Sequence, residues 1–358
     1  MGRKIWVLAI ILLLLMGQAR AADVTLPEEL RRAAPEVAEL MGDGEKKFDL
    51  TNGVKQIWLR GKKEVERHLS SGIRSVISLM MAGVFLGTAE SLSPRGEDFF
   101  CRCITMVGAL WITAVSAGDV DALMGLGRET IGEISAFSKL LLPSLAAATA
   151  AGGGVTAASV RQVAAVFVSD ILLTVIDALL MPMVHLYIGV AAASAVLEEE
   201  GLERAGKLLK RVIVWSLSGI LILFTTYLTI SGAVASAVDE RAVRLAKAAV
   251  SGAVPVVGGI LSGVAESVLA GAGILRGMIG TFGALAVVSI CLVPVLRLGV
   301  QYLLYQGAGL VVAIAGPKKL TRLIVRLSDA FALVLAMTVA SAMVLVISVV
   351  SSLTAVMP

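Results

Sequence analysis

The sequence is poor in charged and in aromatic residues. Asp, Glu, Lys and Arg make up 16% of the 358 residues, whereas soluble domains carry about 25%. Hydrophobic residues make up 57%, and the mean hydropathy is +0.89. This balance excludes a soluble globular enzyme and predicts several segments that lie in lipid. With 5% aromatic residues and 36 glycines, the helices are expected to pack through small side chains.

Cysteine and histidine are also scarce, with three and two residues. Cys101 and Cys103 are one residue apart and Cys291 lies in an apolar run, which we interpret as small buried side chains. A structural zinc needs four ligands, so we expect no metal site. Phosphate-binding loops, His-Glu-x-x-His and dinucleotide glycine fingerprints are absent from the sequence, so we expect no cofactor, no catalytic residues and no enzyme.

The net charge of +4 comes from basic residues beside apolar segments. Basic residues in that position orient a chain in the bilayer, so the expected partner is lipid and not nucleic acid.

The first 21 residues have the pattern of a signal peptide. Arg3 and Lys4 precede an apolar core over 5–16, and Ala19 and Ala21 are placed for cleavage after Ala21. The alternative, an uncleaved membrane helix, is disfavoured because twelve residues reach only about 18 Å across a core of about 30 Å.

Residues 22–71 are predicted to form a short extracytoplasmic helical region, too small for a catalytic domain. Apolar residues recur at helical spacing from Val54 to Val76, with charged residues between them. This amphipathic stretch is expected to continue directly into a first membrane segment at 72–89.

Residues 72–358 are predicted to form an all-α, polytopic membrane helix bundle of about 7–9 segments. After 72–89, the apolar runs are 100–118, 134–151, 162–197, 212–237, 253–275, 279–315 and 328–355. Pro182 and Pro294 interrupt two runs that are too long for one simple span.

Two basic linkers are predicted to be cytoplasmic, at 198–211 and just after Gly316. If the mature chain starts outside and 100–118 and 134–151 each cross the membrane, both linkers stay inside only when 162–197 turns back at Pro182. We therefore expect a re-entrant or broken helix there, a second out-and-back passage at 279–315, and an extracytoplasmic C-terminus.

Asp170, Asp177 and His185 form a candidate polar stripe within an apolar run. Ionisable groups at membrane depth indicate function, unless each carboxylate pairs with a basic residue of a neighbouring helix. Glu266, Arg276 and Arg297 form a second sparse set, for which snorkelling to the headgroups is the alternative.

Glycines that allow close helix packing are concentrated in one stretch, in which two pairs have the Gly-x-x-x-Gly spacing. The candidates are Gly258, Gly259, Gly263, Gly273 and Gly277.

The residues after Asp239 resemble those of the stage III sporulation protein AE family. The most specific block runs from Val250 to Gly259 and contains Pro-Val-Val-Gly-Gly at 255–259. A signal peptide, a polar region with Phe48-Asp49 and a glycine-rich multi-span body occur in the order that the family shows. Gly263 departs from the acidic residue expected in many relatives, and Glu266 holds the next acidic position.

The resemblance implies a membrane subunit of the channel, or feeding tube, between mother cell and forespore. It implies a platform or conduit in the mother-cell membrane around the forespore. The implied partners are an ATPase, ring-forming proteins and membrane subunits of the same operon, with a homo-oligomer as a further possibility. The rival hypothesis is a secondary transporter whose substrate site lies at broken helices near Asp170, Asp177 and Pro182.

Overall fold

The computed structural model describes residues 32, 50–92, 98–151, 157–197, 199–253 and 258–354. Some side chains within these ranges lie outside that description, chiefly those of 50–58, 67–71, 149–151, 157–163, 232–253 and 258–276. Every described element is helical, which confirms the all-α class. The predicted signal peptide, the polar residues 22–31 and 33–49, and Phe48-Asp49 lie outside the described residues. The elements are α4 (Leu50–Ser91), α5 (Asp98–Ala151), α6 (Ala157–Val175), the π-turn η1 (Ile176–Leu180), α7 (Met181–Leu197), α8 (Glu200–Ala253), α9 (Gly258–Ala315) and α10 (Lys318–Thr354).

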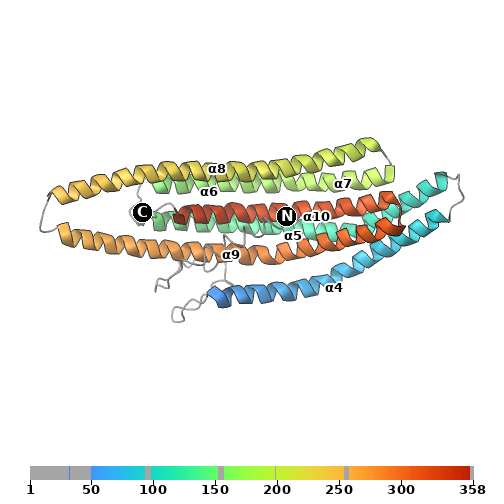
Figure 1. Ribbon diagram of the computed structural model, residues 1–358, viewed down its shortest axis with the longest axis horizontal. Coiled ribbons are helices and arrows are strands. Elements are labelled where there is room, and N and C mark those ends of the chain that lie inside the picture. The colour runs from blue at the N-terminus through green and yellow to red at the C-terminus, as the bar shows by residue number, and fades with distance from the viewer. Residues whose placement is uncertain are drawn as a thin grey trace.

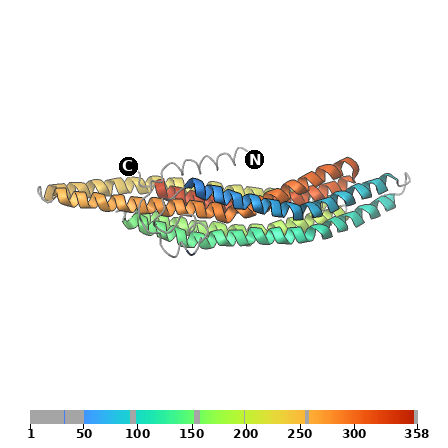
Figure 2. The same cartoon turned by 90° about the horizontal axis from the view of Figure 1, so that it is seen from below.

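The helices lie side by side as long rods in a narrow bundle (Figures 1 and 2). Successive rods run in opposite directions, and α6, η1 and α7 together form one of them (Figure 1). The N-terminal ends of α8 and α10 lie at the same end of the bundle, on the right in Figure 1. We call this the basic end, because it carries Arg204, Lys207, Lys210, Arg211, Lys318, Lys319, Arg322 and Arg326. Both basic linkers are therefore at one end, as the charge pattern predicts.

Six of the described helices are long and apolar enough to cross a membrane, which is consistent with membrane localisation. Their apolar parts are Gly72–Ser91, Cys101–Ala148, Ala164–Leu197, Gly201–Ser231, Gly277–Ile314 and Lys318–Ser351. The number within the described residues is below the predicted seven to nine, because runs that the sequence separates are joined in single helices.

The first joined pair is 100–118 and 134–151, which both belong to α5. The two runs were expected to be separate membrane segments, and that expectation is wrong because the charged and glycine-containing stretch between them is helical as well. Its apolar residues Val120, Leu123, Met124, Ile131 and Ile134 recur at helical spacing and are buried. Their burial keeps this stretch helical and makes α5 one rod.

The predicted return of the chain at Pro182 is also wrong. The chain passes from α6 to α7 through η1, where the Met181 N–H bonds to the Ile176 carbonyl, five residues back. A π-turn of this kind is widened by one residue, so the chain accommodates Pro182, which has no N–H, without reversing. Figure 1 shows α6 and α7 in line beside α8.

Each of these two corrections changes the number of times the chain crosses the bundle by one, and the two changes cancel. With 100–151 as one rod and 157–197 as another, both basic linkers still fall at the same end of the bundle. The predicted out-and-back passage at 279–315 is wrong as well, because α9 continues through Pro294. The prediction that the amphipathic stretch continues into the first membrane segment is confirmed, since α4 is one helix over Leu50–Ser91.

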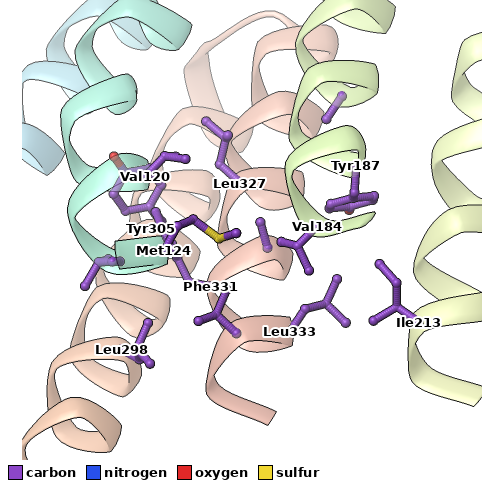
Figure 3. Close-up of a cluster of buried hydrophobic side chains, with 14 of the residues drawn as sticks. Val120, Met124, Val184, Tyr187, Ile213, Leu298, Tyr305, Leu327, Phe331 and Leu333 are labelled. Atoms are coloured by element: carbon purple, nitrogen blue, oxygen red, sulfur yellow. The ribbon is translucent and has the colours of Figure 1, made fainter. Parts of the chain in front are cut away.

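The core is built around α10, which packs against α9, α5, α7 and α8. Figure 3 shows side chains from these helices meeting, among them Met124, Val184, Leu298 and Phe331. The Tyr305 and Phe331 rings lie edge to face with centroids 4.9 Å apart. Contact with these four helices and with α6 requires α10 to be apolar over most of its surface.

Close helix approach occurs at glycines that the sequence does not single out. A Cβ on Gly127 of α5 would lie 2.4 Å from Val334 Cγ1 of α10, and one on Gly83 of α4 would lie 2.5 Å from Val312 Cγ2 of α9. A Cβ on Gly277 would meet no atom within 4 Å in the described part of the chain. Gly258, Gly259, Gly263 and Gly273 lie on α9 where the side-chain surroundings are outside the described residues.

The shared end predicts a common accessibility for the two basic linkers. Single cysteines at 207 and 318, on a background without native Cys, should react with an impermeant maleimide only after cell lysis. A cysteine at 63, on the other side of the apolar part of α4, should react in intact cells. Different accessibility at 207 and 318 would contradict the fold.

The contact at Gly127 predicts opposite effects for two neighbouring glycines. Gly127→Ala should lower the free energy of unfolding by about 1–3 kcal/mol because its methyl group overpacks against Val334. Gly125→Ala should raise it by up to about 1 kcal/mol, because alanine favours the helix and no described atom lies within 4 Å of a Cβ there. Unfolding in detergent measures both, and Val334→Ala should rescue Gly127→Ala. Equal effects of the two alanines would refute the close contact.

Candidate functional site

Asp119 of α5 is a carboxylate at the junction of three helices. Its Oδ2 accepts hydrogen bonds from the Tyr305 hydroxyl at 2.8 Å and from Gln301 Nε2 at 2.9 Å, both on α9. Its Oδ1 accepts a longer bond of 3.5 Å from the Ser75 hydroxyl of α4. One side chain thus joins α4, α5 and α9, and we call Ser75, Asp119, Gln301 and Tyr305 the polar clamp.

The polar clamp is enclosed by the core. Tyr305 is 0% exposed and Gln301 is 8% exposed, while Asp119 itself is half-buried. Ser116, almost one turn before Asp119, is also buried. The partners belong to the same helices as the core residues, so apolar packing sets the positions from which the donors reach the carboxylate.

Neutral donors satisfy Asp119. Within the described residues no Lys or Arg forms a salt bridge with it. Hydrogen bonds to a buried carboxylate offset part of the cost of removing it from water. If α9 moved away from α5, Gln301 and Tyr305 would lose their acceptor inside the core. The arrangement therefore fixes the relative position of the helices.

The predicted polar stripe pairs with another face of α5, about half a turn around the helix from Asp119. Asp170 of α6 pairs with Lys139 Nζ at 2.9 Å, and Asp177 of η1 pairs with Arg128 Nε at 3.2 Å. The carboxylate side chains are 41% and 46% exposed. His185 Nδ1 lies 3.1 Å from the Met181 carbonyl of its own helix. The two Asp residues are thus in partly exposed ion pairs that hold α6 and η1 against α5.

The structure describes the side chains of some of the other candidate residues but not of all of them. Arg297 is half-buried on α9, one turn before Gln301. Glu266 and Arg276 lie on α9 where side chains are outside the described residues. Cys291 is buried as expected, but Cys101 and Cys103 are only half-buried. Within the described ranges, no group of three His, Cys, Asp or Glu side chains could hold a metal ion.

Sequence reasoning missed the polar clamp. Asp119 directly follows the apolar run 100–118, between two expected membrane segments, and was not singled out as a candidate residue. Its two partners on α9 are 182 and 186 positions away in the sequence. The sequence contains one clue to the polar clamp. Gln301 and Tyr305 are four residues apart, so they share one helical face.

Comparison with known proteins identifies relatives. A sequence model described as Stage III sporulation protein AE matches residues 34–355. The chain is similar to Stage III sporulation protein AE of Bacillus subtilis (strain 168), with 23% identity over 169 residues. That alignment covers 47% of this chain and 42% of the relative, so it spans less than half of the relative's length. No solved structure matches the chain.

The polar clamp predicts different effects for two nearby carboxylates. Asp119→Ala should lower the free energy of unfolding by about 1–3 kcal/mol because buried donors lose their acceptor. Asp121→Ala, at an exposed position on the same helix, should change it by no more than about 0.5 kcal/mol. Both are measured by unfolding of the full chain in detergent.

A second variant tests whether Asp119 acts through its hydrogen bond to Tyr305 or only through its charge. Tyr305→Phe should destabilise the wild type but cost less in the Asp119→Ala background, because the hydrogen bond is already gone. Additive effects of the two changes would show that Asp119 and Tyr305 act independently.

Proposed function

This chain belongs to the stage III sporulation protein AE family, and we propose that it serves as a membrane subunit of the channel between mother cell and forespore. The match over 34–355 confirms the resemblance predicted from residues 250–259 and supports a role in sporulation. We propose a platform or conduit component in the mother-cell membrane around the forespore, without enzymatic activity, on which other proteins of the complex assemble.

The packed interior of the bundle carries this proposal. Side chains from α5, α7, α8, α9 and α10 meet around α10, and Leu180, Val184, Leu298 and Val334 are 0% exposed there. Close packing of this kind leaves little room for solute movement along the centre of the bundle. A passage in the complex would then lie between chains, and this subunit would form part of its wall or support.

The outer surface also suits an assembly in lipid. Exposed apolar side chains occur along α5 and α8, including Trp111, Trp215, Ile222 and Leu223. Such faces pack against lipid or against other membrane subunits. We propose that the partners are the ATPase, ring-forming proteins and membrane subunits of the same operon, and that further copies of this chain join them. The basic end would face the cytoplasm, and the N-terminal region would be extracytoplasmic.

The rival function is a secondary transporter. Transporters of this kind bind substrate at discontinuous helices near the midplane. Here the rod from Ala157 to Leu197 continues through η1, and Asp170 and Asp177 are occupied by Lys139 and Arg128. These ion pairs give the two carboxylates a structural role in joining helices, which favours the channel subunit.

Two measurements on the full chain distinguish the functions. The tagged protein from sporulating cells should co-purify with the ring proteins of its operon, and the purified chain alone should take up no solute into liposomes. Asp170→Asn/Asp177→Asn should lower protein level and assembly together, because Arg128 and Lys139 lose their partners.

A different result would favour the transporter. Solute uptake by the purified wild type, lost in a stable Asp170→Asn/Asp177→Asn protein, would overturn the channel-subunit proposal. Asp121→Asn is the matched control, since it removes one exposed carboxylate from α5 and should leave uptake, level and assembly unchanged.

A further inference from the structure

A cavity of about 200 Å³ lies at the basic end, where α7, α8 and α10 meet. Its polar lining consists of Ser194, Glu199, Glu203, Lys319, Arg322 and Arg326. Pockets for drug-sized ligands measure roughly 300–1,000 Å³, so this one suits a compact polar group.

Glu203 of α8 organises the cations around this cavity. Its carboxylate lies 3.0 Å from Lys207 Nζ, 3.0 Å from Arg322 Nη1 and 3.3 Å from Arg326 Nη2. One carboxylate is thus shared by three cations. A few residues further along, Lys210 and Asp329 form a one-to-one pair at 2.7 Å. Among the side chains that pair with Glu203, the positive charges therefore outnumber the negative charge.

The two guanidinium groups differ in exposure. The Arg326 side chain is 15% exposed, and its Nη1 donates a hydrogen bond to the Ser194 hydroxyl of α7. The Arg322 side chain is 54% exposed. Arg326 is held in a fixed position deep in the cavity, and Arg322 lies where a ligand from outside can reach it. Together with Lys319, they outnumber the two lining carboxylates of Glu199 and Glu203.

The cavity lies where the apolar parts of two helices begin. The apolar part of α8 starts at Gly201 and that of α10 at Lys318. Leu197 and Leu208, on the two helices beside the cavity, are 59% and 58% exposed. Basic and apolar groups at this boundary lie at the level of lipid headgroups when the helices cross the membrane.

We propose that this cavity binds the phosphate of an anionic phospholipid headgroup. The phosphate oxygens accept hydrogen bonds from Arg322 and Arg326, and the charge of Lys319 adds to the attraction. Arginine suits this site because its planar group donates two parallel bonds to a phosphate. The acyl chains then lie along the exposed apolar residues of α7, such as Leu197 beside the cavity and Leu186 on the same face of the helix. Glu203 competes for the same guanidinium groups and weakens the binding.

The competing explanation is that the cations only tie α8 to α10. Variants that are expected to change phosphate binding in opposite directions distinguish a phosphate site from a purely structural cluster. Arg322→Gln leaves Glu203 paired with Lys207 and Arg326, so folding is retained, but phosphate loses its accessible donor. Glu203→Gln frees the cations. Arg211→Gln is the matched control, because Arg211 is an exposed arginine at the same end that does not line the cavity.

The test uses the full chain in detergent and a phosphatidylglycerol with a fluorescent tail, with anisotropy as the measurement. A basic side chain near a phospholipid surface contributes about 1 kcal/mol, so Arg322→Gln should bind about fivefold more weakly than wild type. Glu203→Gln should bind more tightly, Arg211→Gln should match the wild type, and tail-labelled phosphatidylcholine should bind weakly to all. Thermal unfolding checks that each variant is folded.

Three results would overturn the proposal. Equal losses in Arg322→Gln and Arg211→Gln would indicate a general surface charge, and weaker binding by Glu203→Gln would indicate a purely structural cluster. Inorganic phosphate or the water-soluble glycerophosphoglycerol headgroup may be added as competitors. If either displaced the lipid at concentrations comparable to that of the lipid, the site would take its phosphate from solution and not from the membrane.

Discussion

The burial of α10 is the constraint on which the rest of the fold depends. A helix in contact with five others is buried over most of its length, and the buried residues of α10 from Leu320 to Val349 are apolar or small hydroxyl side chains. The hydroxyls of Thr338, Ser341 and Ser348 bond to carbonyls four residues back, so they add no unsatisfied polar group to the core. The other helices then need only one apolar face each, the one that meets α10 or a neighbour.

Three carboxylates within the long rods, Asp119, Asp170 and Asp177, have partners that fit their positions. Asp119 is satisfied by neutral donors that are themselves buried, whereas Asp170 and Asp177 pair with the exposed cations Lys139 and Arg128. This division follows from solvation, because a buried ion pair brings two desolvation costs and a hydrogen-bonded carboxylate brings one. It also explains how α5 carries several charged residues through its middle and stays a single helix of 54 residues.

The sequence supports the all-α class, the family and the continuous first helix, because composition and local periodicity determine these. It misleads at 119–133 and at Pro182, where charge and proline resemble loop signals. At 119–133 the buried positions from Val120 to Ile134 already had helical spacing, which was a better guide than the charges between them. The polar clamp was beyond local reasoning, since whether Asp119 meets Tyr305 depends on how α5 packs against α9.

The length of the helices bears on how the bundle sits in a membrane. A helix of 58 residues such as α9 is roughly 87 Å long, almost three times the thickness of the hydrocarbon core of about 30 Å. The apolar parts of α8 and α10 begin at the basic end, so the excess length projects from the opposite side, where α8 and α9 extend beyond the other helices (Figure 1). In the orientation that we propose, with the basic end in the cytoplasm, this α8–α9 hairpin would project on the extracytoplasmic side of the membrane.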